Sequence, residues 1–489
     1  MAAEHYLAID LGAESGRLIL GSLEGERLSL EEIHRFPNGP VRIHGHLHWD
    51  VLRMWSEILH GLRLAGRKTG GLASLGVDTW GVDFGLLDDA GNLLGNPYHY
   101  RDNRTDGMLE TAFERLSRQE IYRQTGIQFM QINSLYQLLA MRLENSPELD
   151  CASTLLTMPD LFNFWLTGRK ASEFTIATTT QCYNPVAADW AWDVLDALDI
   201  PQRLFQPLVQ PGIVLANLRS DVAREGELAS LPVVAVGSHD TASAVAAVPA
   251  ESSRIVFISS GTWSLVGSET TRPVISEQSL SFNFTNEGGI GGSFRFLKNI
   301  SGLWLVQEFR RAWAAAGQEY SYADLTRLAA EAPSFRSLVD PNSAVFLSPG
   351  EMPGRIRGYC KERGQPVPET VGEFVRCALE SLALAYRKTI GQLEQALGYP
   401  LEAVHIVGGG SLNRLLNQFT ADATGKLVIA GPVEATAIGN LLVQAMALGR
   451  LSSLAEARQL VRRSFPLEVF EPGQREVWEE AYRRWLKLQ

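Results

Sequence analysis

A short polar segment, Gly-Ser-His-Asp-Thr at residues 237–241, carries the side chains best suited to chemistry. It follows an apolar run at 232–236, which predicts a buried strand, and precedes an Ala-rich stretch at 241–248, which predicts a closely packed helix. Ligands of α/β folds bind beyond the carboxyl ends of strands, so Asp240 lies where a carboxylate could take the proton of an attacking hydroxyl. Aspartate is also a good helix N-cap, and this segment alone favours neither role.

A second group of polar residues begins at Asp10, directly after an apolar run at 6–9. Gly12 and Gly16 follow, then a second apolar run at 18–20, so the pattern predicts a β-hairpin whose tip lets the backbone approach a ligand closely. The N–H groups of such a turn can hold phosphate oxygens, and a carboxylate beside them can hold a hydrated Mg²⁺. For one isolated motif, an ordinary turn capped by the aspartate is the favoured alternative.

A similar strand–turn–strand pattern returns about half the chain later. Strand patterns at 254–258 and 263–266 flank a small polar turn that contains Gly261. The repeat predicts a duplicated α/β domain with a cleft between the copies, although two unrelated hairpins remain the alternative on pattern grounds. The best linker candidate is Pro-Ala-Glu-Ser-Ser at 249–253, so we place the domain boundary between residues 248 and 249.

Glycine-rich and amide-rich loops complete the set of candidates. Three consecutive glycines at 408–410 follow a strand pattern at 404–407, and without Cβ atoms a flat ring or a phosphate can lie against the backbone there. Polar turns at 286–289 and 298–302 stand beside aromatic residues, which fits a carbohydrate pocket. A tight strand-to-helix turn and plain loop chemistry are the respective alternatives.

The elements that must position these residues alternate along the chain, which indicates an α/β protein. The pattern predicts short buried strands at 75–78 and 84–87 and helices at 110–125, 134–144, 371–397 and 412–424. The last segment, 454–488, has the pattern of a charged amphipathic helix around a Pro-containing break.

Composition limits the classes of function. The chain has 489 residues, of which 45% are hydrophobic and 20% charged, and this suits two domains with cores of their own. A net charge of -11 argues against a nucleic-acid binder. Four scattered cysteines without a C-x-x-C pair argue against a disulfide scaffold and a zinc site. The chain starts without a signal-peptide pattern and has no stretch apolar enough to span a membrane, so we expect a cytoplasmic protein.

Nine segments, in consistent order and spanning almost the whole chain, resemble the FGGY family of carbohydrate kinases. They are 10–17 (Asp-Leu-Gly-Ala-Glu-Ser-Gly-Arg), 78–84 (Asp-Thr-Trp-Gly-Val-Asp-Phe), 100–102 (Tyr-Arg-Asp), 177–181 (Ala-Thr-Thr-Thr-Gln), 238–244 (Ser-His-Asp-Thr-Ala-Ser-Ala), 259–265 (Ser-Ser-Gly-Thr-Trp-Ser-Leu), 286–289 (Asn-Glu-Gly-Gly), 297–304 (Leu-Lys-Asn-Ile-Ser-Gly-Leu-Trp) and 405–410 (His-Ile-Val-Gly-Gly-Gly). One such segment would be weak support, whereas nine in order favour the functional interpretation of each motif.

The resemblance implies two actin-like (ribonuclease H-like) α/β domains with mixed sheets flanked by helices and the active site in the interdomain cleft. Residues 1–248 would bind sugar and residues 249–489 ATP. The implied reaction is phosphorylation of a small ketose by ATP, with Asp240 as the catalytic base. The residues that match sugar-binding positions are Gly81, His239, Asp240, Thr241 and Asn299. Those that match ATP-binding positions are Ala13, Glu14, Ser15, Gly16, Arg17, Thr262, Gln307 and Gly409. Asp10 matches the carboxylate near Mg²⁺.

One position departs from the family pattern, because Glu14 stands where a small polar residue is expected. The alternatives to a kinase for one ketose are a kinase for another ketose or polyol, a non-enzymatic sugar sensor, and an actin-like ATPase. A sensor usually adds a basic helix-turn-helix, and none precedes Tyr6. As partners we expect the ketose and ATP, without nucleic acid or membrane, and a monomer or small homo-oligomer.

Overall fold

The structure, a computed structural model that describes residues 3–489, contains two compact units, each assembled from three stretches of the chain. The first unit contains the residues up to Pro249, Glu269–Phe296 and Ala435–Ser464. The second contains Ala250–Ser268, Leu297–Glu434 and Phe465–Gln489. The boundary between residues 248 and 249 that the sequence suggests for two family domains stays a prediction.

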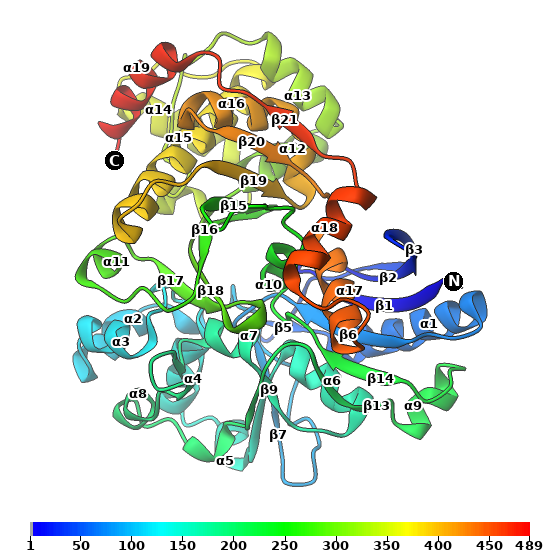
Figure 1. Ribbon diagram of the computed structural model, residues 1–489. Coiled ribbons are helices and arrows are strands. Elements are labelled where there is room, and N and C mark those ends of the chain that lie inside the picture. Colours follow the sequence, from blue (N-terminus) through cyan, green and yellow to red (C-terminus); the bar gives the residue numbers. More distant parts are fainter. Residues whose placement is uncertain (1–2) are drawn as a thin grey trace. The chain divides into compact units, whose positions relative to one another are not determined.

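A six-stranded mixed sheet forms the centre of the first unit (Figure 1). Its order is β13 (Ile213–Asn217), β14 (Pro232–Ala235), β6 (Ser74–Thr79), β1 (Glu4–Leu11), β2 (Ser15–Glu24) and β3 (Arg27–Pro37). β1 runs antiparallel to β2 and parallel to β6, and β6 runs parallel to β14. All but the first two residues of β1 are buried, which explains why its sequence is apolar without alternation.

The second unit has a sheet of the same kind. β15 (Ile255–Ser260) runs antiparallel to β16 (Trp263–Thr270) and parallel to β19 (Ala403–Val407). β20 (Leu427–Ala430) pairs with β19 in parallel, and β21 (Glu468–Phe470) pairs with β20 antiparallel. β18 (Phe294–Ser301), whose last residues belong to this unit, lies next to β16.

The two sheets repeat one topology. The order β3-β2-β1-β6-β14-β13 in the first corresponds strand by strand to β18-β16-β15-β19-β20-β21 in the second, whose sheet has a seventh strand, β17 (Thr285–Gly288), next to β18. The central pairs also agree in direction, since each sheet has an antiparallel hairpin, two parallel pairings and an antiparallel edge strand. The internal repeat predicted from the two glycine turns is therefore confirmed as a repeat of the fold.

Helices cover both sheets (Figure 1). Those of the first unit are α1 (Val51–Thr69), α2 (Met108–Arg115), α3 (Arg118–Thr125), α4 (Ser134–Leu143), α5 (Pro147–Cys151), α6 (Met158–Thr167), α7 (Phe174–Ala177), α8 (Trp192–Ala197), α9 (Ser220–Glu225), α10 (Asp240–Ala246), α11 (Glu277–Ser281), α17 (Ala435–Ala447) and α18 (Leu454–Ser464). Those of the second are α12 (Trp304–Ala315), α13 (Tyr322–Glu331), α14 (Met352–Glu362), α15 (Val371–Leu397), α16 (Arg414–Thr424) and α19 (Arg475–Leu486). Short strands are β4 (Pro40–Ile43), β5 (His46–Trp49), β7 (Phe84–Leu87), β8 (Thr154–Thr157), β9 (Ser172–Glu173), β10 (Tyr183–Asn184), β11 (Asp189–Trp190), β12 (Leu208–Val209) and β17 (Thr285–Gly288).

Two sequence-based expectations for elements are wrong. The helix predicted at 110–125 is two helices, α2 and α3, because Leu116 is extended and the hydroxyl of Ser117 accepts the backbone N–H of Glu120 to start a new helix. The segment 454–488 contains the strand β21 between its two helices, since residues after the break pair with β20. The 27-residue helix α15 has the bounds that were predicted.

The core of the first unit lies between its sheet and the helices α1 and α6. Fully buried apolar side chains there include Leu7, Ile9, Ile58, Val77 and Phe162. Burial of each such side chain contributes roughly 1.5–3 kcal/mol relative to exposure. This packing fixes the strand ends from which the polar loops project.

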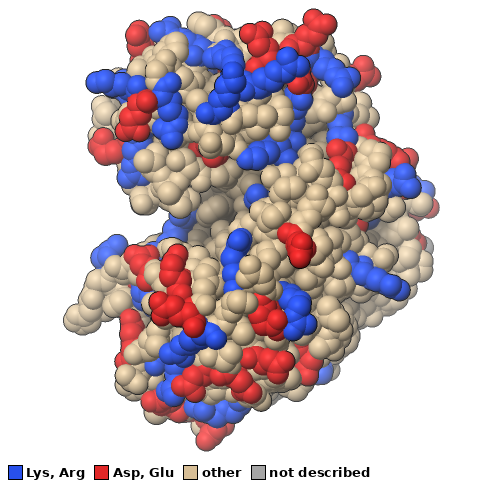
Figure 2. Space-filling view, turned by 90° about the vertical axis from the view of Figure 1, so that its left-hand side faces the viewer, with Lys and Arg blue, Asp and Glu red and all other residues tan. Residues whose placement is uncertain are grey.

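The surface shows no single dominant charge on the face drawn in Figure 2, where basic and acidic side chains are interspersed. Among the helices of residues 3–489, none combines the length and apolar character that crossing a membrane requires.

Candidate active site

Asp240 is the first residue of α10, just beyond the strand β14. Its side chain is 32% exposed, and its Oδ1 accepts a hydrogen bond from the hydroxyl of Thr241 at 3.0 Å. The helix cannot shift easily, because a Cβ atom on Gly439 of α17 would lie 1.7 Å from the carbonyl oxygen of Ser243. The two helices thus touch backbone to backbone, and this contact holds the carboxylate of Asp240 in place.

The loop before Asp240 is held by a buried carboxylate. Oε2 of Glu173 accepts hydrogen bonds from the backbone N–H of Ser238 at 3.3 Å and from the hydroxyl of Thr175 at 2.6 Å. The hydroxyl of Thr175 in turn accepts the N–H of His239 at 3.1 Å. Burial raises the pKa of Glu173 to about 7 against the effect of these donors.

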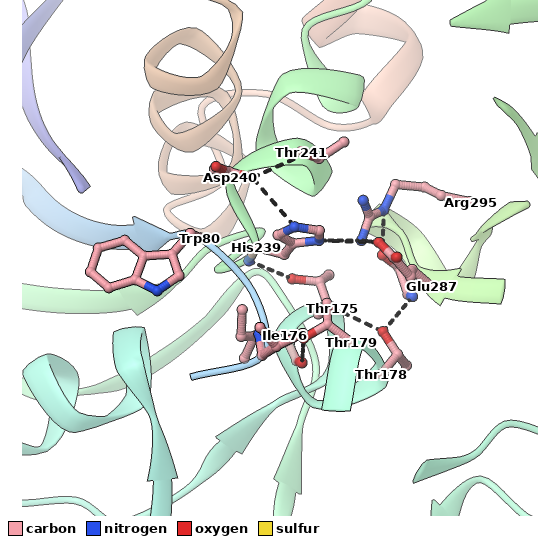
Figure 3. Close-up of polar contacts among 12 residues, drawn as sticks. Trp80, Thr175, Ile176, Thr178, Thr179, His239, Asp240, Thr241, Glu287 and Arg295 are labelled. Carbon is pink, nitrogen blue, oxygen red and sulfur yellow. Dashed lines mark hydrogen bonds and ion pairs between the residues drawn. The ribbon is translucent and has the colours of Figure 1, made fainter. Parts of the chain in front are cut away.

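His239 also contacts a buried ion pair, as Figure 3 shows. Its Nδ1 lies 3.1 Å from Nη2 of Arg295 and 3.2 Å from Oε2 of Glu287, and Nη2 lies 3.2 Å from the same carboxylate oxygen. On its other side, Nε2 of His239 lies 3.4 Å from Oδ1 of Asp240. The Arg295 side chain is fully buried, so the carboxylate of Glu287 supplies the charge that its guanidinium needs.

Threonines of α7 and the following 3₁₀ turn (Thr178–Thr180) connect these residues to Gly81. The hydroxyl of Thr178 accepts the N–H of Gly288 at 2.7 Å, next to Glu287. The hydroxyl of Thr179 accepts the N–H of Val82 at 3.2 Å and would lie 3.2 Å from a Cβ atom on Gly81. Gly81, predicted to bind sugar, therefore lies against the same threonine segment that supports His239.

A second buried carboxylate, Asp83, organises the aromatic side of this region. Its Oδ2 accepts the indole N–H groups of Trp49 at 2.6 Å and Trp80 at 2.9 Å, and its Oδ1 accepts the amide of Gln137 at 2.9 Å. Burial raises the pKa of Asp83 to about 6. The two indole rings are 4.0 Å apart between centroids, which makes a rigid wall beside Gly81.

Asp10 lies at the end of β1, where the first hairpin begins. It forms an ion pair with Arg17 across the hairpin, and it is the register partner of Asp78 on the parallel strand β6. Oδ2 of Asp78 accepts the side-chain amide of Asn440 at 2.6 Å, while its Oδ1 has no hydrogen-bond partner among residues 3–489. Burial, with Asp10 and then Asp240 nearby, raises the pKa of Asp78 well above its usual range.

The first hairpin turn contains the predicted phosphate-binding residues Ala13, Glu14, Ser15 and Gly16. The turn is closed by the N–H of Gly12, which donates to the carbonyl of Ser15 at 3.0 Å. Asn38 braces it from outside, since its amide donates to the carbonyl of Gly12 at 2.8 Å and its N–H to that of Glu14 at 3.0 Å.

The residues of this region do not form a metal site made of protein alone. Within residues 3–489, no group of three or more His, Cys, Asp or Glu side chains is arranged to hold a metal ion. Mg²⁺ commonly keeps several waters and binds through one or two carboxylates plus substrate phosphates, so Asp10 with the neighbouring Asp78 fits such a partial site.

In the second unit, glycines from two other segments pack against the turn that contains Gly261 and Thr262. A Cβ atom on Gly302 would lie 2.6 Å from the carbonyl oxygen of Gly261, and one on Gly410 would lie 2.0 Å from the hydroxyl of Ser260. The N–H of Gly302 donates to the carbonyl of Thr262 at 3.1 Å. These approaches require glycine, because the segments pack against one another where a side chain would otherwise lie.

The remaining predicted residues of the second unit lie on nearby elements. Gln307 is in the first turn of α12, one turn after Leu303, whose N–H donates to Gly261 at 2.9 Å. Gly409 begins the short 3₁₀ turn Gly409–Leu412, and Asn299 lies on β18. The structure thus groups Thr262, Gln307 and Gly409 around the second hairpin.

Sequence reasoning assigned no role to Glu173, Thr175 or Arg295. Glu287 was noticed only as part of the turn at 286–289 that fits a carbohydrate pocket, and the segment at 177–181 only as a motif. The available signal was an arginine at 295 between two phenylalanines of a strand, since a charge within a buried strand requires a partner.

Comparison with known families matches the chain in two blocks. Residues 5–247 match the N-terminal domain, and residues 256–448 the C-terminal domain, of the FGGY family of carbohydrate kinases. Two similar curated proteins are both described as rhamnulokinase. The protein from Bacteroides thetaiotaomicron is 46% identical over 98% of this chain and 98% of its own length. The protein from Pectobacterium atrosepticum is 42% identical over 100% of this chain and 97% of its own.

Solved structures with the same fold are more distant in sequence. A gluconate kinase from Lactobacillus acidophilus superposes with a TM-score of 0.82 at 16% identity, covering 100% of this chain and 98% of that one. A ligand-bound xylulose kinase from the same organism gives a TM-score of 0.82 at 16% identity, covering 99% and 97%. These likenesses confirm the predicted two-domain α/β fold.

Proposed function

The chain belongs to the FGGY family of carbohydrate kinases, and from that premise we propose that it transfers the γ-phosphate of ATP to the terminal hydroxyl of L-rhamnulose, giving L-rhamnulose 1-phosphate. The substrate is supported by relatives called rhamnulokinase that are 42–46% identical over nearly the full chain. The chemistry is supported above all by Asp240, a partly exposed carboxylate fixed at the start of α10 beside His239 and Thr241.

Asp240 acts as the general base in this proposal. It accepts the proton of the sugar hydroxyl as the hydroxyl oxygen attacks the γ-phosphorus in line, while the bond from that phosphorus to the bridging oxygen of ADP breaks. His239, Thr241 and Gly81 hold the sugar, and Asn299 of the second unit adds a further contact. Phosphoryl transfer depends on position and charge more than on covalent chemistry, so the rigid support from Glu173 contributes directly to rate.

The two hairpins receive the nucleotide. Backbone N–H groups of residues 13–17 and of Thr262 donate to phosphate oxygens, and the exposed backbone at Gly409 accepts the flat adenine or ribose. Gln307 adds a side-chain contact. Asp10 would hold Mg²⁺ there through water, and the ion would supply neutralisation of the phosphate charge. Since ATP is supplied in the cytoplasm, we place the enzyme there, as a monomer or small homo-oligomer.

The test is ADP release by purified protein with Mg-ATP and rhamnulose, fuculose, xylulose, ribulose or glycerol. A strong preference for rhamnulose in kcat/KM supports the proposal. Preference for another sugar keeps the kinase and replaces the substrate. If the folded protein binds ATP but releases no ADP with any sugar, the kinase proposal is wrong, and a non-enzymatic sugar sensor becomes the better interpretation.

A further inference from the structure

Three polar atoms meet at a single point inside the first unit, and only one arrangement of protons satisfies them. Nδ1 of His239, Nη2 of Arg295 and Oε2 of Glu287 are separated by 3.1–3.2 Å in each pair. The guanidinium only donates and the carboxylate only accepts, so the imidazole nitrogen determines the pattern. Nδ1 can accept a hydrogen bond from Arg295, or it can carry a proton and donate to Glu287. It cannot do both.

The geometry at Nδ1 decides between these patterns. The contact between Nδ1 and Nη2 of Arg295 is a hydrogen bond, whereas Nδ1 and Oε2 of Glu287 are only within ion-pair distance, so Nδ1 accepts the guanidinium N–H. A neutral imidazole then carries its single proton on Nε2, 3.4 Å from Oδ1 of Asp240. A doubly protonated ring would instead turn an N–H toward the N–H of a fully buried guanidinium.

We infer that the buried Arg295–Glu287 pair fixes His239 as the neutral tautomer with its proton on Nε2, so that Oδ1 of Asp240 receives two donors and Oδ2 is left as the proton acceptor. The inference rests on the proposed role of Asp240 as base. The hydroxyl of Thr241 donates to Oδ1 at 3.0 Å. Nε2–H of His239 faces the same oxygen at 3.4 Å, a contact that we expect to shorten into a hydrogen bond when substrate binds. Arg295 and Glu287 are positioning residues, since they act through His239.

The arrangement has a consequence for the transfer step. The sugar proton moves to Oδ2 of Asp240 while the oxygen–phosphorus bond forms and the bond from phosphorus to ADP breaks. If His239 turned its bare nitrogen to Asp240, lone pairs would face each other and the carboxylate would rotate away. Arg295 holds the His239 ring against such a turn (Figure 3). The Nε of Arg295 also donates to the carbonyl of Gly288 at 2.7 Å, next to Glu287, so the guanidinium is fixed to strand β17.

The first experiment reads the tautomer of the unmodified enzyme. Protein labelled with ¹⁵N-histidine is examined at pH 7–8 by long-range ¹H–¹⁵N correlation, and His239→Gln identifies the ring by the signals it removes. We expect two widely separated nitrogen shifts, with the proton on Nε2. A proton on Nδ1, or two similar shifts of an imidazolium, overturns the inference.

The second experiment tests the pair itself. Arg295→Lys loses the fork that reaches both Gly288 and His239, so we expect a tautomer change and a fall in kcat of about 10²-fold, with a smaller change in KM for the sugar. Arg458→Lys, which alters an ion pair with Glu269 in the same unit, is the matched control and should change neither. A folded Arg295→Lys enzyme with the original tautomer and kcat overturns the inference.

Glu287→Gln covers the case in which Arg295→Lys does not fold. Its amide keeps the shape of the carboxylate, so Arg295 should still donate to Nδ1 and the tautomer should persist. A switch to Nδ1–H would mean that the Glu287 carboxylate controls the tautomer, and this would overturn the inference.

Asp240→Asn separates this result from the proposed function. Near-normal turnover in that variant removes Asp240 as base whatever the tautomer, whereas loss of turnover with the wrong tautomer removes only the inference.

Discussion

Equivalent positions in the two sheets carry different chemistry. In the first hairpin, Asp10 pairs with Arg17 across the turn and with Asp78 on the parallel neighbour. In the second, Ser259 holds the corresponding position, opposite Leu265 across the hairpin and Val407 on the parallel neighbour. One backbone topology therefore presents three ionisable side chains in one unit and none in the other.

The difference shows how a duplicated frame can divide a reaction. Charged groups near the first hairpin suit the transferring phosphate, its metal and proton transfer, because these steps move charge. The second hairpin offers backbone N–H groups, with the exposed backbone at Gly409 nearby, and these suit a bound nucleotide without adding charge. Substitutions in the first unit should therefore act mainly on kcat, and those in the second mainly on binding of ATP.

The largest effect is expected at Asp240, the proposed base of the first unit. Asp240→Asn keeps the size and the contact with Thr241 but cannot take a proton, so kcat should fall roughly 10²–10⁴-fold. The measurement is steady-state ADP release, with binding of sugar followed by calorimetry. Asp221→Asn, an exposed carboxylate paired with Arg219 in the same unit, is the control and should retain full activity. Turnover near that of the unmodified enzyme would rule out Asp240 as the catalytic base.

The next effect compares the two hairpins directly. Asp10→Asn removes a charged contact of about 1.5–3 kcal/mol, so kcat/KM should fall roughly 10- to 100-fold and more Mg²⁺ should be needed for half-maximal rate. Ser259→Ala, the equivalent change in the second hairpin, should leave the Mg²⁺ requirement as it was. Mg²⁺ titrations of both variants provide the measurement. Equal shifts in both would end the distinction between a charged and a neutral hairpin.

A smaller effect should appear at the packed glycines of the second unit. Gly302→Ala places a Cβ atom 2.6 Å from the carbonyl oxygen of Gly261, and overpacking of this kind costs about 1–3 kcal/mol. We expect the KM for ATP to rise roughly tenfold, with the KM for sugar nearly unchanged. Gly391→Ala on α15 meets nothing within 4 Å and serves as the control. A rise in the KM for sugar without a rise in the KM for ATP would contradict the prediction that Gly302 supports ATP binding.

Sequence reasoning reached the parts of this picture that are local. Both hairpins, the strand before Asp240 and the helix α15 follow from short runs of apolar residues and glycine turns, so they could be predicted. The repeat of six strands could be suspected from the two hairpins alone. The division of α2 from α3 was missed because the hydroxyl of Ser117 outweighs a continuous helical periodicity.

The network behind Asp240 could not be predicted, because its members come from distant segments. Glu173, Glu287 and Arg295 meet the loop at His239 only after the strands and the threonine turn have packed together. No periodicity or motif in the sequence indicates that these segments come into contact. The roles of the predicted sugar and ATP residues stay predictions, although the structure groups them around the expected strand ends.

The smallest effect concerns stability, where one lysine of the second unit and one carboxylate of the first have pH dependences of opposite sign. Burial lowers the pKa of Lys298 on β18 to about 8 from its ordinary 10.5, with Lys388 adding to the shift, whereas burial raises the pKa of Glu173 in the first unit to about 7. For the lysine, the folded state releases its proton first as pH rises. Its contribution to stability is therefore complete above pH 10.5 and is lost as the pH falls through 8.

Lys298→Met removes this buried charge with little change in shape. The variant should be more stable at pH 7 by at most about 3 kcal/mol, and the rise in stability of the unmodified protein between pH 8 and 10.5 should flatten. Urea unfolding at a series of pH values measures both. Lys361→Met, at an exposed position of α14 in the same unit, should leave the pH profile unchanged. An unaltered slope in Lys298→Met would mean that Lys298 is hydrated in the folded protein, and the contrast in sign between Lys298 and Glu173 would lose its basis.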